Sequence, residues 1–213
     1  MNTKKKIISI CLAVCLIAIA VTGFSLAYFT DNDSKTNTFT VGNVDIELVE
    51  PTWERNPNYV ASSDDANGGL TNVQPGVAYT KDPTVNNIGA NDAYIRVNVT
   101  LTKASAFKAA AKEHGITDLS TVFGGHDESK WTRDTITEDE DADTITYSYL
   151  FNEIVVPGAS TGALFTTVTI PGAFTSAEME AIGNFEIIIT ADAIQAAGFD
   201  TPAAAFTEFD AVA

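Results

Sequence analysis

Two histidines, His114 and His126, are the chain's candidates for metal ligation or acid–base chemistry. Zinc proteolysis usually requires two histidines on one helix face and a nearby carboxylate, as in HExxH, and neither histidine lies in that pattern. His114 stands at a predicted helix end, where a cation suits the helix dipole. The sequence therefore predicts no catalytic residue and no metal ligand. Two solvated histidines are favoured over a zinc ion shared with a distant carboxylate.

A serine in the segment Gly158–Gly162 matches the G-x-S-x-G pattern of hydrolase nucleophiles. In such enzymes the serine, here Ser160, sits on a strand-to-helix turn and has a histidine later in the chain. A strand is predicted after Ser160, and no histidine follows His126. We therefore interpret the segment as a turn.

The acidic run Glu138–Asp143 offers closely spaced carboxylates, the ligands that calcium prefers. It lacks the glycine and the ligand spacing of an EF-hand loop. We interpret it as a solvated turn before a strand and predict no cofactor. Calcium held by Asp139, Asp141 and Asp143 is the weaker alternative.

The N-terminus has the pattern of an export signal. A basic head ending at Lys6 precedes the apolar run Ile7–Val21, and Ser25 and Ala27 fit the small residues required before a signal-peptidase cut. We predict cleavage between Ala27 and Tyr28, with residues 1–27 as signal peptide and residues 28–213 as a single secreted domain. The alternative is an uncleaved membrane anchor, because the uncharged stretch is long enough to span a bilayer.

Charge and cysteine content narrow the class of protein further. The chain has 12 basic and 28 acidic residues, and removing residues 1–27, which hold three lysines and no acid, leaves a net charge of −19. Such a surface repels phosphate backbones and anionic lipid heads, so we expect no nucleic-acid partner and no membrane contact after processing. Both cysteines lie in the apolar run, so the secreted domain has none for disulfides or thiolate chemistry.

The elements that must position these residues are mostly strands. Period-two alternation of apolar and polar residues predicts strands at Thr38–Val49, Ala93–Thr102, Thr144–Phe151, Ala163–Ile170 and Asn184–Thr190, with shorter pieces broken by Pro83. Turn-punctuated strands of this kind favour an antiparallel β-sandwich.

Short helices are inserted among these strands. Helices are predicted at Lys103–His114, after a capping box from Thr175 to Glu178, and after Thr201-Pro202, with a helical turn at Asp192–Ala197. Residues 51–74, rich in Asn, Asp, Ser, Gly and Pro, are expected to form a surface loop. The expected fold class is therefore mostly β, with short inserted helices.

Three segments resemble the TasA/camelysin family, whose members carry a SipW-dependent type of signal peptide. Ala27–Leu48 has an aromatic pair and an acid at the cut, followed by N-x-F-x-x-G-x-V-x-I. Gln74–Asn87 is similar to the block P-G-x-x-x-T-K-D-P-x-V-x-N, and Pro157–Pro171 to P-G-x-x-T-x-x-L-F. The resemblance implies a jelly-roll-like sandwich, processing by a dedicated ER-type signal peptidase, and a structural role in biofilm-matrix fibres of Gram-positive bacteria.

Three functions follow as hypotheses. The first is a secreted structural subunit that self-associates into filaments through residues 28–41. The assembly strand contains Tyr28, Phe29, Phe39 and Val41. Strand addition of this kind joins subunits head to tail, and such a contact extends into a filament because it does not close on itself. The alternative is that Thr38–Val49 pairs within its own sandwich and the protein stays monomeric. The second function is a metalloendopeptidase, a class that camelysin members carry. The third is a secreted carbohydrate- or protein-binding module.

Overall fold

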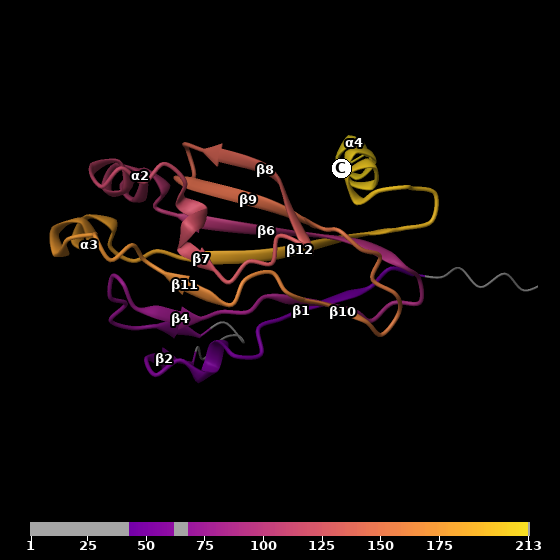
Figure 1. The fold of residues 1–213 in the computed structure, drawn as a ribbon, viewed down its shortest axis with the longest axis horizontal. Coiled ribbons are helices and arrows are strands. Elements are labelled where there is room, and N and C mark those ends of the chain that lie inside the picture. The colour runs from indigo at the N-terminus through magenta and orange to yellow at the C-terminus, as the bar shows by residue number, and fades with distance from the viewer. Residues whose placement is uncertain (1–42, 62–67, 213) are drawn as a thin grey trace, which may run out of the picture. The chain divides into compact units, whose positions relative to one another are not determined.

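The computed structural model describes residues 43–61 and 68–212, which form a mostly β fold in which every strand pair is antiparallel. The prediction of a mostly β, antiparallel fold is confirmed (Figure 1). The proposed cleavage residues Ala27 and Tyr28 and the assembly residues Phe29, Phe39 and Val41 lie outside the described residues.

The first layer is a four-stranded sheet with the order β12-β6-β9-β8. Its two central strands, β6 (Ala93–Thr102) and β9 (Thr144–Phe151), have the predicted bounds. The apolar residues that alternate along β6 from Ile95 to Leu101 are excluded from solvent, as the period-two pattern requires. The outer strands are β8 (Trp131–Asp139) and β12 (Ile187–Gln195).

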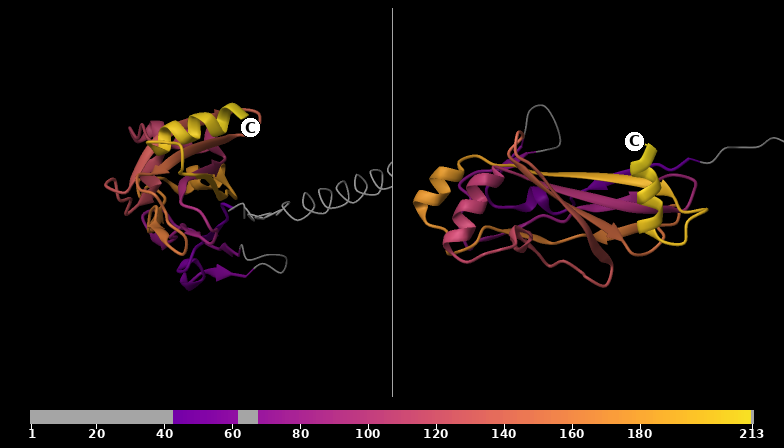
Figure 2. Two further views of the ribbon diagram at one scale, coloured as in Figure 1. Left: turned by 90° about the vertical axis from the view of Figure 1, so that its right-hand side faces the viewer. Right: turned by 90° about the horizontal axis from the view of Figure 1, so that it is seen from above.

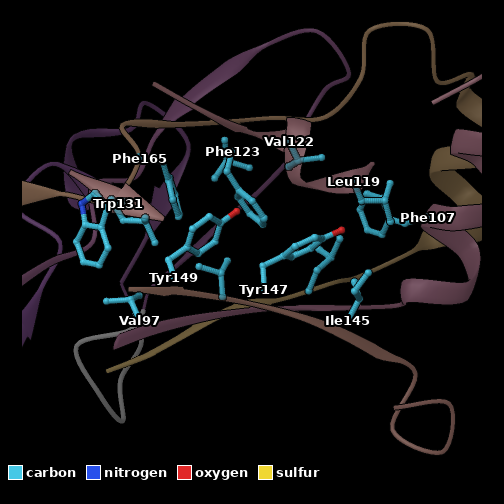
Figure 3. Packing of buried hydrophobic residues seen from close by; sticks show 14 of the residues in the cluster. Val97, Phe107, Leu119, Val122, Phe123, Trp131, Ile145, Tyr147, Tyr149 and Phe165 are labelled. Atoms are coloured by element: carbon cyan, nitrogen blue, oxygen red, sulfur yellow. The ribbon is translucent and has the colours of Figure 1, made fainter. Parts of the chain in front are cut away.

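The second layer consists of two three-stranded sheets, with the orders β1-β5-β10 and β4-β11-β7. Pro83 separates β4 from β5, as predicted. The strands are β1 (Ile46–Val49), β4 (Ala78–Thr80), β5 (Thr84–Asn87), β7 (Phe123–Gly124), β10 (Ser160–Ala163) and β11 (Thr167–Thr169). A single large hydrophobic core joins the layers, with Tyr147 and Tyr149 of the first layer packed toward Phe123 and Phe165 (Figure 3).

Three α-helices complete the described fold: α2 (Ala104–Glu113), α3 (Ser176–Ile182) and α4 (Pro202–Val212). The capping box predicted for α3 is present, and α2 and α3 lie together at one end of the layers. Helix α4 lies on the outer face of the first layer (Figure 2), where Phe206 packs beside Arg96. Over the described ranges, the helices are too short or too polar to cross a membrane.

Several segments differ from the sequence prediction. The single strand expected at Ala163–Ile170 is interrupted, because β10 ends at Ala163 and β11 begins at Thr167, and β8 was not predicted as a strand. The helical turn expected at Asp192–Ala197 is wrong, because β12 continues to Gln195 and pairs with β6 along its whole length. Residues 51–74, expected as a loop, contain the 3-10 helix η1 (Trp53–Arg55) and the hairpin strands β2 (Tyr59–Val60) and β3 (Gly69–Leu70). Contacts between residues far apart in the chain hold these elements in place. For example, Trp53 Nε1 donates a hydrogen bond to the Gly68 carbonyl over 2.9 Å.

A buried amide fixes the end of the second layer. The Asn87 side chain is fully buried, and its Nδ2 donates to the carbonyls of Asn91 and Val155 over 2.8 and 2.7 Å. Its Oδ1 accepts from the Gly89 N–H at 3.0 Å. With all three of these hydrogen bonds made, the amide joins β5 to the loop at Asn91 and to Val155, which forms an isolated bridge with Ala93.

We expect Asn87→Ala to destabilise the protein by about 3 kcal/mol, because it removes the three hydrogen bonds of a buried amide at about 1 kcal/mol each. The matched control is Asn86→Ala, whose half-buried amide makes one contact, 3.3 Å long, with Glu47. The free energies of unfolding from chemical denaturation test this. Equal losses in the two variants would contradict the role given to Asn87.

Candidate assembly surface

Strands β1 and β12 lie near each other on one side of the layers, and each is paired on one side only within the described residues. β1 pairs with β5 from Ile46 to Val49, and β12 pairs with β6 from Ile187 to Gln195. An edge strand presents a row of unpaired backbone N–H and C=O groups, which can accept another strand. Two such edges therefore flank this side of the fold.

The side chains along these edges are apolar and incompletely covered. We call them the β1–β12 seam; its members are Val44, Ile46, Leu48, Ile187, Ile189, Ala191 and Ala193, all partly exposed while packing on the core. On the neighbouring strand β6, the inward-facing residues Val97 and Val99 are completely buried. The hydrophobic core thus ends at the seam with apolar surface still facing solvent, and an added strand would gain free energy by covering it.

Three sequence segments, residues 27–48, 74–87 and 157–171, supply neighbouring strands of the second layer. The first provides part of β1, the second provides β4 and β5, and the third provides β10 and β11. They are paired as β1-β5-β10 and β4-β11. Side chains reinforce the pairing, since Thr161 Oγ1 accepts from the Val85 N–H at 3.1 Å. Segments far apart in the chain therefore build one continuous part of the fold.

The residues Thr80, Lys81 and Asp82 anchor the chain that follows β1. Lys81 is buried, and its Nζ lies 2.7 Å from Glu50 Oε1 and 4.5 Å from the centre of the Trp53 ring. The Asp82 carboxylate accepts from the Thr52 N–H at 2.9 Å, and Thr80 Oγ1 donates to the Thr52 carbonyl over 3.1 Å. These contacts hold the C-terminal end of β1 in place.

The histidines are used in structural contacts. His114 Nε2 lies 3.0 Å from Glu178 Oε1, and the ring stacks on Phe174, which joins the end of α2 to α3. The hydrogen bond from the Thr175 N–H, followed by the one from His114, lowers the pKa of Glu178 to about 2. His126 Nδ1 lies 3.0 Å from the Leu164 carbonyl oxygen. In the described ranges, no three His, Cys, Asp or Glu side chains form a group that would hold a metal ion.

Ser160 and the acidic run lie in turns and strands. Ser160 is the first residue of β10, and its Oγ accepts from the Gly162 N–H at 3.2 Å. Asp139 Oδ1 accepts from the Ala142 N–H at 2.9 Å, while Asp143 Oδ1 accepts from the Ser105 N–H at 2.8 Å, at the start of α2. These two carboxylates organise the β8–β9 turn and the entry into α2.

Comparison of the chain with protein-family models, with curated proteins and with solved structures finds no match.

The seam was not identified from the sequence. The alternation of Ile187, Ile189, Ala191 and Ala193 is visible in the printed chain, but the helical interpretation of Asp192–Ala197 cut it short. That β12 and β1 meet at one side depends on the pairing of β12 with β6 and of β1 with β5, which join residues far apart in the chain. The period-two pattern, which continues to Ala193, was the signal in the sequence that would have extended the predicted strand.

We expect Lys81→Ala to destabilise the protein by about 3 kcal/mol, because it leaves the partly buried Glu50 carboxylate without its counter-charge. The matched control is Lys108→Ala, which breaks an exposed ion pair with Glu138 and should cost less than about 1 kcal/mol. Urea titration of both variants measures the difference. A Lys81 variant as stable as the Lys108 variant would show that the buried pair does not anchor β1.

Proposed function

We propose that the protein is a secreted structural subunit of extracellular biofilm-matrix fibres, in which the N-terminal segment 28–41 of one subunit adds as a strand to the next. The observation that carries this proposal is the β1–β12 seam, where two edge strands present apolar side chains that the described residues cover only in part. The resemblance of three sequence segments to the TasA/camelysin family supports the same function.

The start of the described domain suits this mode of assembly. The alternative hypothesis places Thr38–Val49 in the protein's own sandwich, and Ile46–Val49 do pair with β5 in that way. Residues 28–41 precede this strand and contain Phe29 and Phe39, whose aromatic rings suit an apolar seam. A subunit that donates at one end and accepts at its own seam makes a head-to-tail contact, which extends without closing.

Export would control the timing of assembly. If the signal peptidase cuts between Ala27 and Tyr28, the donor segment gains a free end only after translocation. We expect the secreted protein to begin at Tyr28, and the intact mass of the extracellular protein checks this. A product that keeps residues 1–27 and stays in the membrane would show that the protein is anchored there and is not released as a free subunit.

The donor segment is tested by deleting Tyr28–Asn37 from the secreted protein. We expect the deletion to abolish filament growth without unfolding the domain, and Phe29→Ala to slow growth because it removes about 2 to 3 kcal/mol of apolar burial. Light scattering and electron microscopy measure growth, with circular dichroism as the folding control. Filaments that form at an unchanged rate after the deletion would exclude the donor strand.

The acceptor seam is tested with a matched pair of substitutions on β12. Ile189→Thr reduces the apolar surface of the seam, whereas Ile188→Thr changes an exposed residue of the same strand that alternates to the other face. We expect the first variant to assemble more slowly and the second to behave like the unsubstituted protein. Equal rates in both variants would place the acceptor elsewhere.

Added salt or a divalent cation should speed assembly, because a subunit with a net charge of −19 repels its copies and ions screen that repulsion. The comparison uses the unsubstituted secreted protein at several ionic strengths. An absence of filaments under all of these conditions would favour a monomeric binding module over a fibre subunit.

A further inference from the structure

Strand β8 is the other outer strand of the first layer, and it is unusually open. It pairs with β9 alone, and every residue after the buried Trp131 is exposed. Apart from the β8–β9 pairing, no backbone hydrogen bond reaches Thr132–Asp139 from any part of the chain that the structure describes. The free side of β8 therefore presents unpaired N–H and C=O groups to solvent.

The first half of β8 is protected against strand addition. The register shifts between Arg133 and Thr135, so that Asp134 forms a bulge. Arg133 Nη1 lies 2.6 Å from Asp118 Oδ2 and donates to Ser120 Oγ over 3.0 Å, which ties this part of the edge to the segment before and within η2 (Leu119–Val122). Beyond the bulge, Thr135–Asp139 pairs with β9 in regular register.

A small pocket lies beneath this regular half. Its volume is about 240 Å³, and its apolar lining comes from Leu119, Ile136, Ile145 and Tyr147. Figure 3 shows Tyr147 and Ile145 on the sheet with Leu119 nearby. Ile136 is 48% exposed although it pairs opposite the buried Tyr147, on the inward-facing side of the sheet. An isoleucine in this position has an inward orientation but lacks a covering neighbour.

Carboxylates border the pocket on both sides of Ile136. Asp118 is paired with Arg133 at 2.6 Å, and Glu138 is paired with Lys108 at 2.6 Å. The side chains of both ion pairs are between 38% and 49% exposed, so each pair contributes little free energy. Another basic side chain can therefore displace the lysine or the arginine from its carboxylate. Basic side chains that arrive with a ligand can compete for the same two carboxylates.

Charge along the edge favours a basic occupant. From Trp131 to Asp141, β8 and its turn carry five carboxylates and one basic residue, Arg133. The chain's own segment Tyr28–Asn37 contains Asp31 and Asp33 against Lys35 alone, and a second copy of the protein is strongly acidic as a whole. Electrostatic complementarity therefore disfavours self-association at this edge and favours a positively charged partner.

We propose that Thr135–Asp139 binds an extended basic segment of a partner protein by strand addition, with the pattern basic-x-apolar-x-basic. Residues two apart in a strand share a face, so the apolar side chain enters the pocket beside Ile136 while the flanking basic side chains reach Asp118 and Glu138. Main-chain hydrogen bonds to the free edge give affinity, and the pocket with its two carboxylates gives specificity. This site is separate from the β1–β12 seam and does not rest on the proposed fibre function.

The test uses a dye-labelled synthetic peptide with the sequence TKTLTKT and the purified secreted protein at low ionic strength. Two matched peptides isolate the contributions: TETLTET reverses the charge, and TKTLTKT with an N-methylated leucine removes a main-chain donor. We expect fluorescence anisotropy to show binding of the first peptide, at least tenfold weaker binding of the N-methylated peptide, and none of the acidic peptide.

Two protein variants locate the binding site. Ile136→Thr should weaken binding of TKTLTKT by roughly five- to tenfold because apolar contact in the pocket is lost. Ile188→Thr is the matched control, since Ile188 is a similarly exposed isoleucine, at 43% against 48%, on the opposite outer strand of the same sheet. Circular dichroism confirms that both variants are folded.

Several results would overturn the proposal. They are equal binding of the acidic and basic peptides, equal effects of the two isoleucine substitutions, or no binding of TKTLTKT at 1 mM peptide. Sedimentation equilibrium adds one more: self-association that Ile136→Thr removes and Ile188→Thr retains would assign this edge to a second copy of the protein.

Discussion

The buried amide of Asn87 determines where the chain enters the domain. Its Oδ1 accepts from the Gly89 N–H, and that same N–H donates to the Asp45 carbonyl over 2.9 Å. A side chain at position 89 would collide with the backbone of residues 43 and 45, because a Cβ there would lie 2.6 Å from Asp45 N. The amide, the glycine and the backbone before β1 therefore form one close-packed unit. The point from which the N-terminal segment leaves the domain is fixed by hydrogen bonds inside the second layer.

The two outer strands of the first layer differ in how their free edges are protected against the addition of another strand. Both outer strands, β8 and β12, leave backbone groups unpaired among the described residues, which is a hazard for aggregation in any sheet protein. β8 carries a bulge, an inward-facing arginine and several carboxylates, which restrict what can add to it. β12 has no comparable protection toward the core, because its inward side chains are isoleucine and alanine. This contrast is why we propose fibre assembly at the β1–β12 seam and a charged, selective contact at β8.

The sequence predicted the elements whose side chains alternate clearly and missed those whose order depends on distant contacts. β6 and β9 were found with their bounds because one face of each is uniformly apolar. β8 was missed because TRDTITED has polar residues on both faces, and its pairing with β9 alone defines it. The helical turn predicted at Asp192–Ala197 is wrong because nine paired positions between β12 and β6 override local preference. The hairpin within residues 51–74 depends on Trp53 and Lys81 contacts that no local pattern reveals.

Of the three segments 27–48, 74–87 and 157–171, the second and third contribute side chains that are largely engaged in contacts within the fold. Lys81 neutralises Glu50, Asp82 and Thr80 hold Thr52, and Thr161 and Asn87 satisfy buried backbone groups. None of these side chains is available to a partner, because each is already engaged within the second layer. A chain can therefore keep the second and third of these segments, and with them the layer that they build, without keeping any particular activity. The assembly that we propose would depend instead on side chains that the layer leaves uncovered, so the apolar character of the seam and of residues 28–41 would have to be selected separately from the segments that specify the fold.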